Sequence, residues 1–98
     1  MSKFNEIIKS EKLVLVDFSA EWCAPCKALA PILKEVKQTL GDSVRIIKID
    51  VDNNPVIAQN LRISGVPTII IYQDGVQKFR QSGVVPASQL IQLLKQYI

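Results

Sequence analysis

Histidine is absent from this 98-residue chain, and cysteine and aromatic side chains are scarce. Its two cysteines cannot supply the roughly four ligands that a zinc ion requires, so only a site shared between two chains could hold zinc. Aromatic residues make up 6% of the chain and the basic residues are scattered, which is not the pattern of a nucleic-acid-binding surface. We therefore expect neither a metal nor a nucleic-acid partner.

Long apolar runs are also missing. None approaches the ~18 residues that span a bilayer, and residues 1–6 contain no apolar stretch of signal-peptide length. These absences predict a cytoplasmic protein that does not bind membranes, in a compartment where thiols stay reduced. A metal-free, cofactor-free monomer is the corresponding expectation for the chain as a whole.

The apolar content is high enough for a core. At 48% hydrophobic residues, a chain of this length buries about 60–68% of its unfolded surface as one domain, residues 1–98. Scaffolds that depend on disulfides are shorter and richer in cysteine. The two cysteines are therefore available for chemistry.

Helical and strand-like patterns alternate along the chain. Helices are expected at residues 2–10, 25–40, 54–61 and 86–97, and strands at 13–19, 44–51, 68–72 and 76–81. The strands at 13–19 and 44–51 are apolar enough to be buried on both faces. Gly41 ends the second helix, Pro31 should kink it, and Asn54 is the predicted N-cap of the third. The order predicts an α/β fold in which a mixed four-stranded sheet is flanked by helices.

The two cysteines lie together at the start of the second helix, in Trp22-Cys23-Ala24-Pro25-Cys26. Two thiols at this spacing can form a disulfide and open it again. The unpaired N–H groups and partial positive charge of a helix N-terminus favour a thiolate at Cys23, and a thiolate is the form that attacks a disulfide. Pro25 holds both sulfurs in place and the small Ala24 lets another chain approach.

Three other residues have a functional and a structural interpretation. Asp17 lies inside an apolar strand, where burial should raise its pKa and let it take the proton of Cys26; the alternative is a solvent-facing carboxylate. Lys48 either pairs with Asp17 across neighbouring strands or is an ordinary solvated lysine. Trp22 either offers a flat surface beside the reactive sulfur or packs in the core.

A fourth such position is Pro67, which directly precedes a predicted strand. About 95% of X–Pro bonds are trans, but a proline at a strand entry, two residues after Gly65, is also a site for a tight cis turn.

With these motifs in order, the chain resembles the thioredoxin family over nearly its whole length. The resemblance implies that Val66–Pro67 is cis and packs against the cysteine pair, and that the Val66 backbone pairs with an extended substrate. It further implies an apolar docking face bordered by Trp22, Val66 and Gly83. Cys23 would then attack, Cys26 would resolve, and Asp17, with Lys48 nearby, would accept the proton.

The chain departs from the family pattern in three places. Ala24 replaces a usual glycine, which puts the redox potential in question, and Ser19 stands where many members have tryptophan. The family's leading strand has no counterpart before the first helix, so one sheet edge should be uncovered.

The implied function is reduction of protein disulfides, with oxidised proteins as substrates and a flavin-dependent thioredoxin reductase regenerating the dithiol. Two alternatives remain. The fold could serve as a binding or accessory subunit with incidental thiols, or the pair could act as an oxidase or isomerase rather than a reductant.

Overall fold

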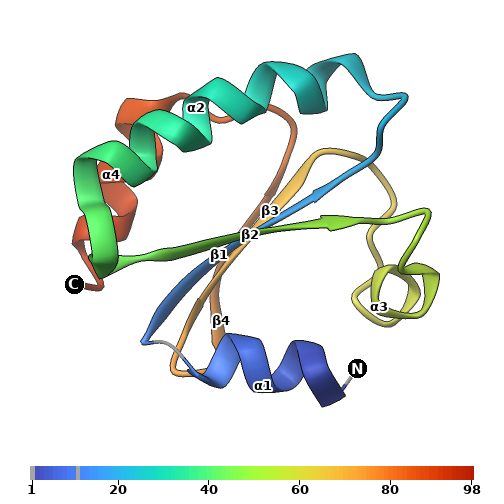
Figure 1. Ribbon diagram of the computed structural model, residues 1–98, viewed down its shortest axis with the longest axis horizontal. Helices are drawn as coiled ribbons and strands as arrows, with labels where there is room; N and C mark the ends of the chain where they lie inside the picture. The colour runs from blue at the N-terminus through green and yellow to red at the C-terminus, as the bar shows by residue number, and fades with distance from the viewer. Residues whose placement is uncertain (1, 11) are drawn as a thin grey trace.

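The computed structural model describes residues 2–10 and 12–98, and this part of the chain forms a sheet between two layers of helices (Figure 1). The elements in chain order are α1 (Ser2–Ser10), β1 (Leu13–Ser19), α2 (Ala24–Leu40), the 3-10 helix η1 (Gly41–Ser43), β2 (Arg45–Asp50), α3 (Pro55–Asn60), β3 (Thr68–Gln73), β4 (Val76–Ser82) and α4 (Ala87–Lys95). The predicted order is confirmed, with bounds that differ by one or two residues.

The four strands form a mixed sheet in the order β2-β1-β3-β4. β1 and β2 are parallel because α2 crosses between them, whereas β3 is antiparallel to both β1 and β4. β1 is buried along its entire length, as its apolar sequence predicts. The C-terminal end of this central strand leads directly to the cysteines.

The prediction that residues 44–51 form a buried strand is wrong. β2 is exposed or half-buried at every position, because it pairs only with β1 and forms one edge of the described sheet. Its isoleucines give it the sequence of a covered strand. In the described chain α1 comes directly before β1, and this edge of the sheet is uncovered, as the comparison with the family pattern predicted.

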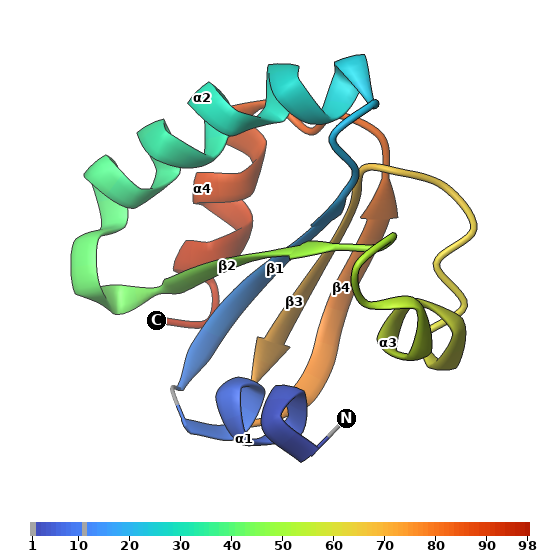
Figure 2. The same cartoon turned by 45° about the vertical axis from the view of Figure 1, so that its right-hand side comes forward.

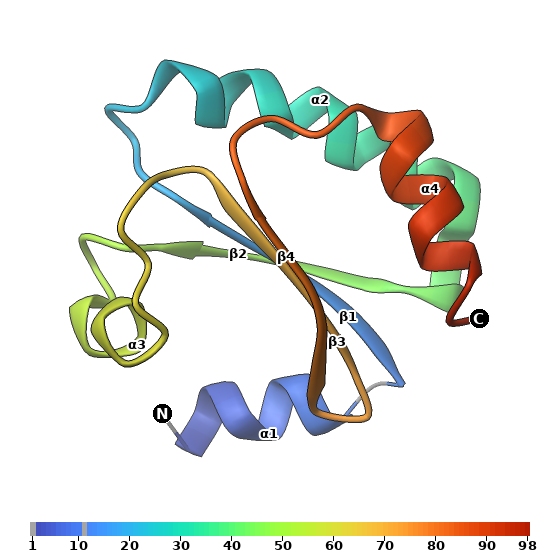
Figure 3. The same ribbon diagram turned by 180° about the vertical axis from the view of Figure 1, so that it is seen from behind.

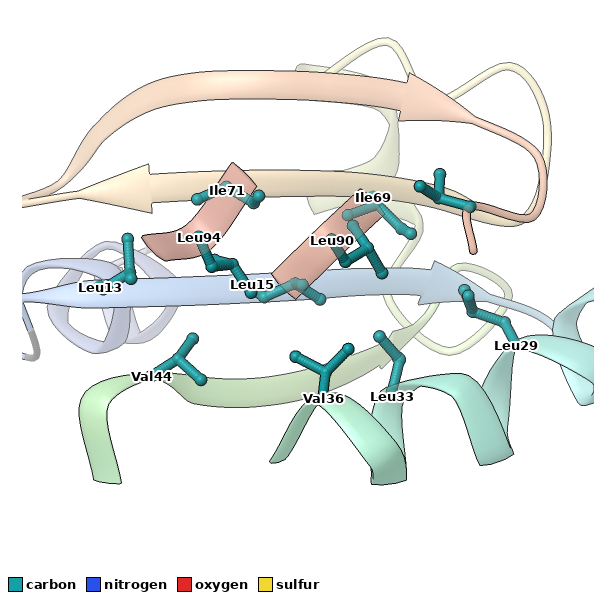
Figure 4. Packing of buried hydrophobic residues seen from close by; sticks show 11 residues of the cluster. Leu13, Leu15, Leu29, Leu33, Val36, Val44, Ile69, Ile71, Leu90 and Leu94 are labelled. Atoms are coloured by element: carbon teal, nitrogen blue, oxygen red, sulfur yellow. The ribbon is translucent and has the colours of Figure 1, made fainter. Parts of the chain in front are cut away.

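Each face of the sheet has its own apolar cluster. Because side chains alternate along a strand, Leu13 and Leu15 face α2 and α4, whereas Val14, Val16 and Phe18 face α1 and α3. Figure 4 shows the first cluster between the sheet and helices α2 and α4. β1 is thereby held on both sides, which makes the position of its C-terminal end well defined.

The helix ends follow their local sequence in part. Gly41 is the C-cap of α2, with a φ of 55°, and α2 continues through Pro31 as one helix. Asn54 occupies the predicted N-cap position of α3, but its side chain makes no capping bond. Its amide instead donates to the carbonyl oxygen of Asp50 at 2.9 Å, which closes the turn after β2.

Candidate active site

The two cysteines lie where the chain passes from β1 into α2 (Figure 2). Cys23 and Cys26 form a disulfide with their Cα atoms 5.3 Å apart. Cys23 is the N-cap residue of α2 and has an extended backbone, so its side chain points back over the first turn of the helix. The C-terminal ends of the parallel strands β1 and β2 lie at this same edge of the sheet, where α/β folds place their chemistry.

The start of α2 is suited to hold a negative charge on Cys23. The backbone N–H of Cys26 donates to Cys23 Sγ at 3.2 Å, and a donor in this position favours an anion on that sulfur once the disulfide opens. The helix dipole acts in the same direction. Ala24 and Pro25 are exposed beside the disulfide, so a partner can approach it from this side.

The connection from α3 to β3 passes beside the link from β1 to α2 (Figure 3), and through Val66 it contacts the cysteine pair. The Val66–Pro67 bond is cis, as the resemblance implies, and the alternative of a trans bond is wrong. Cys23 Sγ lies 3.7 Å from the carbonyl oxygen of Val66, and the Val66 side chain packs against the cysteine pair. Residues more than forty positions apart in the chain thus meet at one sulfur.

The end of β4 supports this connection. The Gly83 N–H donates to the carbonyl oxygen of Pro67 at 2.8 Å, and the hydroxyls of Thr68 and Ser82 lie 3.0 Å apart. Gly83 has a φ of +93° and open space where a Cβ would stand. A side chain at this position would be strained by the backbone and would project into the space beside Pro67.

Trp22 is 72% exposed, so the alternative of a core aromatic is wrong. Its indole N–H donates to Asp52 Oδ2 at 2.8 Å, and the ring borders a hollow of about 460 Å³ lined also by Glu21, Asp50 and Asn53. The predicted docking face is therefore apolar at Val66 but acidic beside Trp22. Asp52 was not predicted as a site residue. The one signal for it in the sequence was the turn-forming run after β2, in which the Asp50 carboxylate accepts from the backbone N–H groups of Asp52 and Asn53.

Asp17 is buried in the middle of β1, and the solvent-facing alternative is wrong. Burial raises its pKa from 3.8 to about 6, and the positive charge of Lys48 offsets part of this rise. Its Oδ1 has no hydrogen-bond partner among the described residues. Since alternate residues share a face, Asp17 lies on the side of Leu15, beneath α2, which carries Cys26 in its first turn.

Lys48 is exposed, and it is the register partner of Asp17 on the parallel strand β2. Within residues 2–10 and 12–98 no ion pair joins the two side chains. Lys48 therefore acts on Asp17 through its charge, at a distance, rather than by a bond.

Two further features are absent from residues 2–10 and 12–98. No group of three or more His, Cys, Asp or Glu side chains among them is arranged to hold a metal ion. In the same residues, no helix combines the length and apolar character that crossing a bilayer requires.

Known proteins are similar to this chain in both sequence and fold. Residues 1–96 match the thioredoxin family model. The chain is 46% identical to the chloroplastic thioredoxin Y of Oryza sativa over 95 residues, covering 96% of this chain and 56% of that protein. It is 43% identical to a thioredoxin-like protein of Synechocystis, covering 99% of this chain and 93% of that protein. The solved structure of a thioredoxin variant from Halobacterium salinarum superposes with a TM-score of 0.89 at 31% identity, covering 99% of this chain and 84% of that one.

The extent of these matches differs. The chain spans only about half the length of the plant relatives but nearly all of the cyanobacterial one. The family model nonetheless covers almost the whole chain, and the cysteine pair, the cis-proline connection and the buried carboxyl group all lie within the matched residues. The chain belongs to the thioredoxin family.

Proposed function

We propose that this protein reduces disulfide bonds in other proteins by dithiol–disulfide exchange. The observation that carries the proposal is the reversible pair itself: Cys23 caps α2 and accepts from the Cys26 N–H, with the Val66 carbonyl beside its sulfur. The Cys26 N–H and the N-terminus of α2 stabilise a thiolate at Cys23, and the Cys26 sulfur lies next to it.

In the first step the reduced protein acts through Cys23. Its thiolate attacks one sulfur of a substrate disulfide, so the substrate S–S bond breaks and a mixed disulfide forms. The other substrate sulfur leaves as a thiolate and takes up a proton. The exposed Trp22, Ala24 and Pro25 and the Val66 backbone surround the sulfur on the side from which a substrate approaches.

In the second step Cys26 resolves the intermediate. Its thiol transfers a proton to Asp17, whose pKa of about 6 lets it accept and later release a proton near neutral pH. The Cys26 thiolate then attacks Cys23 Sγ, the intramolecular disulfide forms, and the second substrate thiol is released. Two electrons have moved to the substrate, and the protein is left in the oxidised form that the structure shows.

The test is reduction of insulin disulfides by the protein with dithiothreitol as the electron source. We expect no catalysis above background for Cys23→Ser. Cys26→Ser, reduced beforehand and freed of dithiothreitol before insulin is added, should form a mixed disulfide that accumulates and that mass spectrometry detects. If the wild type reduces insulin no faster than dithiothreitol alone, the thiols are incidental and the protein is a binding or accessory subunit instead. If Cys23→Ser is as active as the wild type, the proposed mechanism is wrong. Redox titration against glutathione separates a reductant from an oxidase or isomerase, and measures how far Ala24 moves the potential.

The partners that we propose are disulfide-containing proteins and a flavin-dependent thioredoxin reductase, with the protein acting as a cytoplasmic monomer. The reductase would return two electrons and two protons to the Cys23–Cys26 disulfide, whose exposed surroundings give it access. Incubation with such a reductase, its electron donor and no other thiol should yield two free thiols per chain. Light scattering tests the monomer, and cell fractionation tests the location.

A further inference from the structure

The α3–β3 connection, residues 61–67, brings Val66 to the disulfide but has few supports of its own. Most of its residues are exposed or half-buried, in contrast to β3, which follows it. At its end, the Pro67 carbonyl accepts a hydrogen bond from Gly83, the residue directly after β4. What holds the start of the connection therefore helps to decide where Val66 lies.

The connection starts with a turn that suits glycine but contains arginine. The N–H of Arg62 donates to the Gln59 carbonyl at 3.1 Å, and the N–H of Ile63 donates to the Ala58 carbonyl at 2.9 Å. This pair of bonds is the Schellman arrangement that ends many helices. Arg62 has a φ of 55°, a left-handed conformation that side chains other than glycine disfavour, so the turn needs support from outside α3.

Arg80 of β4 provides that support. Its Nη1 donates to the Leu61 carbonyl at 2.6 Å and its Nη2 donates to the Arg62 carbonyl at 2.8 Å. Arg80 is the register partner of Ile70, which belongs to the cluster on the α1 and α3 face, so its side chain starts on the side of α3. Bonds from a charged guanidinium are stronger than neutral ones, and a planar fork fixes two acceptors at once.

The α3–β3 connection is thus bound at both ends, by Arg80 of β4 at residues 61–62 and by Gly83, directly after β4, at Pro67. We propose that Arg80 is a positioning residue for substrate docking: it fixes the connection so that the Val66 backbone stands ready beside Cys23 for an extended substrate. The inference rests on the proposed function, because it assigns this connection as the edge that binds the substrate.

The test compares the reduction of two disulfide substrates by Arg80→Ala and by wild type. Insulin must dock along the connection, whereas a small aromatic disulfide reaches Cys23 without it. We expect KM for insulin to rise about five- to tenfold with kcat unchanged, since losing charge-assisted bonds in a partly exposed turn costs little more than a factor of ten in affinity. The rate with the small disulfide should stay within about twofold, because the N-terminus of α2 is untouched.

Hydrogen exchange gives a readout that does not depend on catalysis. The amides of residues 62–66 should exchange about tenfold faster in Arg80→Ala, while those of β1 keep their protection. Lys78→Ala is the matched control, because it removes an exposed positive charge from the same strand and should behave as wild type. Arg80→Lys keeps the charge but loses the fork, so its KM should lie between the two.

Unchanged KM for insulin in Arg80→Ala would overturn the inference, and so would an equal rise in Lys78→Ala, which would point to net charge. A fall in activity with the small disulfide of the same size would also overturn it, because the defect would then lie at the cysteines. If wild type reduces neither substrate, the proposed function fails, and the exchange rates alone then decide whether Arg80 holds the connection.

Discussion

At the scale of single residues, Asp17 shows how a buried carboxyl group couples stability to pH. Well below pH 3.8 it is protonated whether the chain is folded or unfolded, so its burial carries no electrostatic cost. As the pH rises from 3.8 to about 6, the unfolded chain releases the proton while the folded chain retains it. Unfolding becomes more favourable across this window, and the penalty is constant above it.

Replacing Asp17 with asparagine should therefore stabilise the protein at pH 8. We expect the free energy of unfolding of the oxidised protein to rise by about 2 kcal/mol, somewhat less than the full pKa shift would give because solvent screens part of the charge. At pH 4 the gain should largely disappear. Urea unfolding at both pH values measures it, with Asp42→Asn, an exposed acid in η1, as a control that should change little.

The same substitution should slow catalysis at the second step. Without a proton acceptor, Cys26 attacks only in its small thiolate fraction, so decay of the mixed disulfide at pH 7 should slow by at least about tenfold. The first step should be unaffected. Stopped-flow single-turnover kinetics separates the two, and a slower first step would show that Asp17 acts on Cys23 instead.

Trp22 is 72% exposed directly before Cys23, so its ring can contact a protein that docks at the disulfide, as tryptophan commonly does at interfaces. Trp22→Ala should raise KM for insulin by roughly tenfold, the size expected for an aromatic anchor, and change stability by less than about 1 kcal/mol. Trp22→Phe keeps a ring but loses the bond to Asp52, and so separates the two contributions. A large loss of stability in Trp22→Ala would mean that the ring is structural.

At the scale of elements, the turn that ends α3 places Arg62 in a left-handed conformation that favours glycine. Arg62→Gly should stabilise the protein by about 1 kcal/mol, because glycine adopts the left-handed conformation without steric cost. Gln59→Gly, an exposed position inside the same helix, should instead destabilise it by about 1 kcal/mol. Urea unfolding of the pair tests this, and a loss of stability in both would contradict the strain assigned to Arg62.

At the scale of the whole molecule, the cost of losing an isoleucine should depend on its place in the sheet. Ile70 on β3 and Ile49 on β2 face the same apolar cluster, but Ile70 is fully buried and Ile49 is half-buried at the edge. We expect Ile70→Ala to cost about 2–5 kcal/mol and Ile49→Ala about half as much. Equal costs in urea unfolding would show that the edge strand is as well covered as the centre.

Much of this architecture could be predicted, because period-2 and period-3.6 patterns report which residues face a core. The burial of β2 was predicted wrongly for the same reason, since a run of isoleucines looks alike in a central strand and in an edge strand. Asn54 was predicted as an N-cap, but its side chain donates to the Asp50 carbonyl instead of accepting from α3, because an amide can donate as well as accept and only the fold decides which partner is near. Asp52 and Arg80 escaped prediction because their partners are distant in sequence.

The sequence by itself determined the order of the elements, the place of the cysteine pair at the start of α2, and the unusual acid in β1. These are local properties: each depends on residues within one strand or one helical turn. Only the tertiary structure decided that Val66 contacts Cys23, that the exposed Trp22 donates a hydrogen bond to Asp52, and that Arg80 binds the α3–β3 connection. Such contacts join segments far apart in the chain, and they exist only because the sheet order β2-β1-β3-β4 brings those segments to one edge.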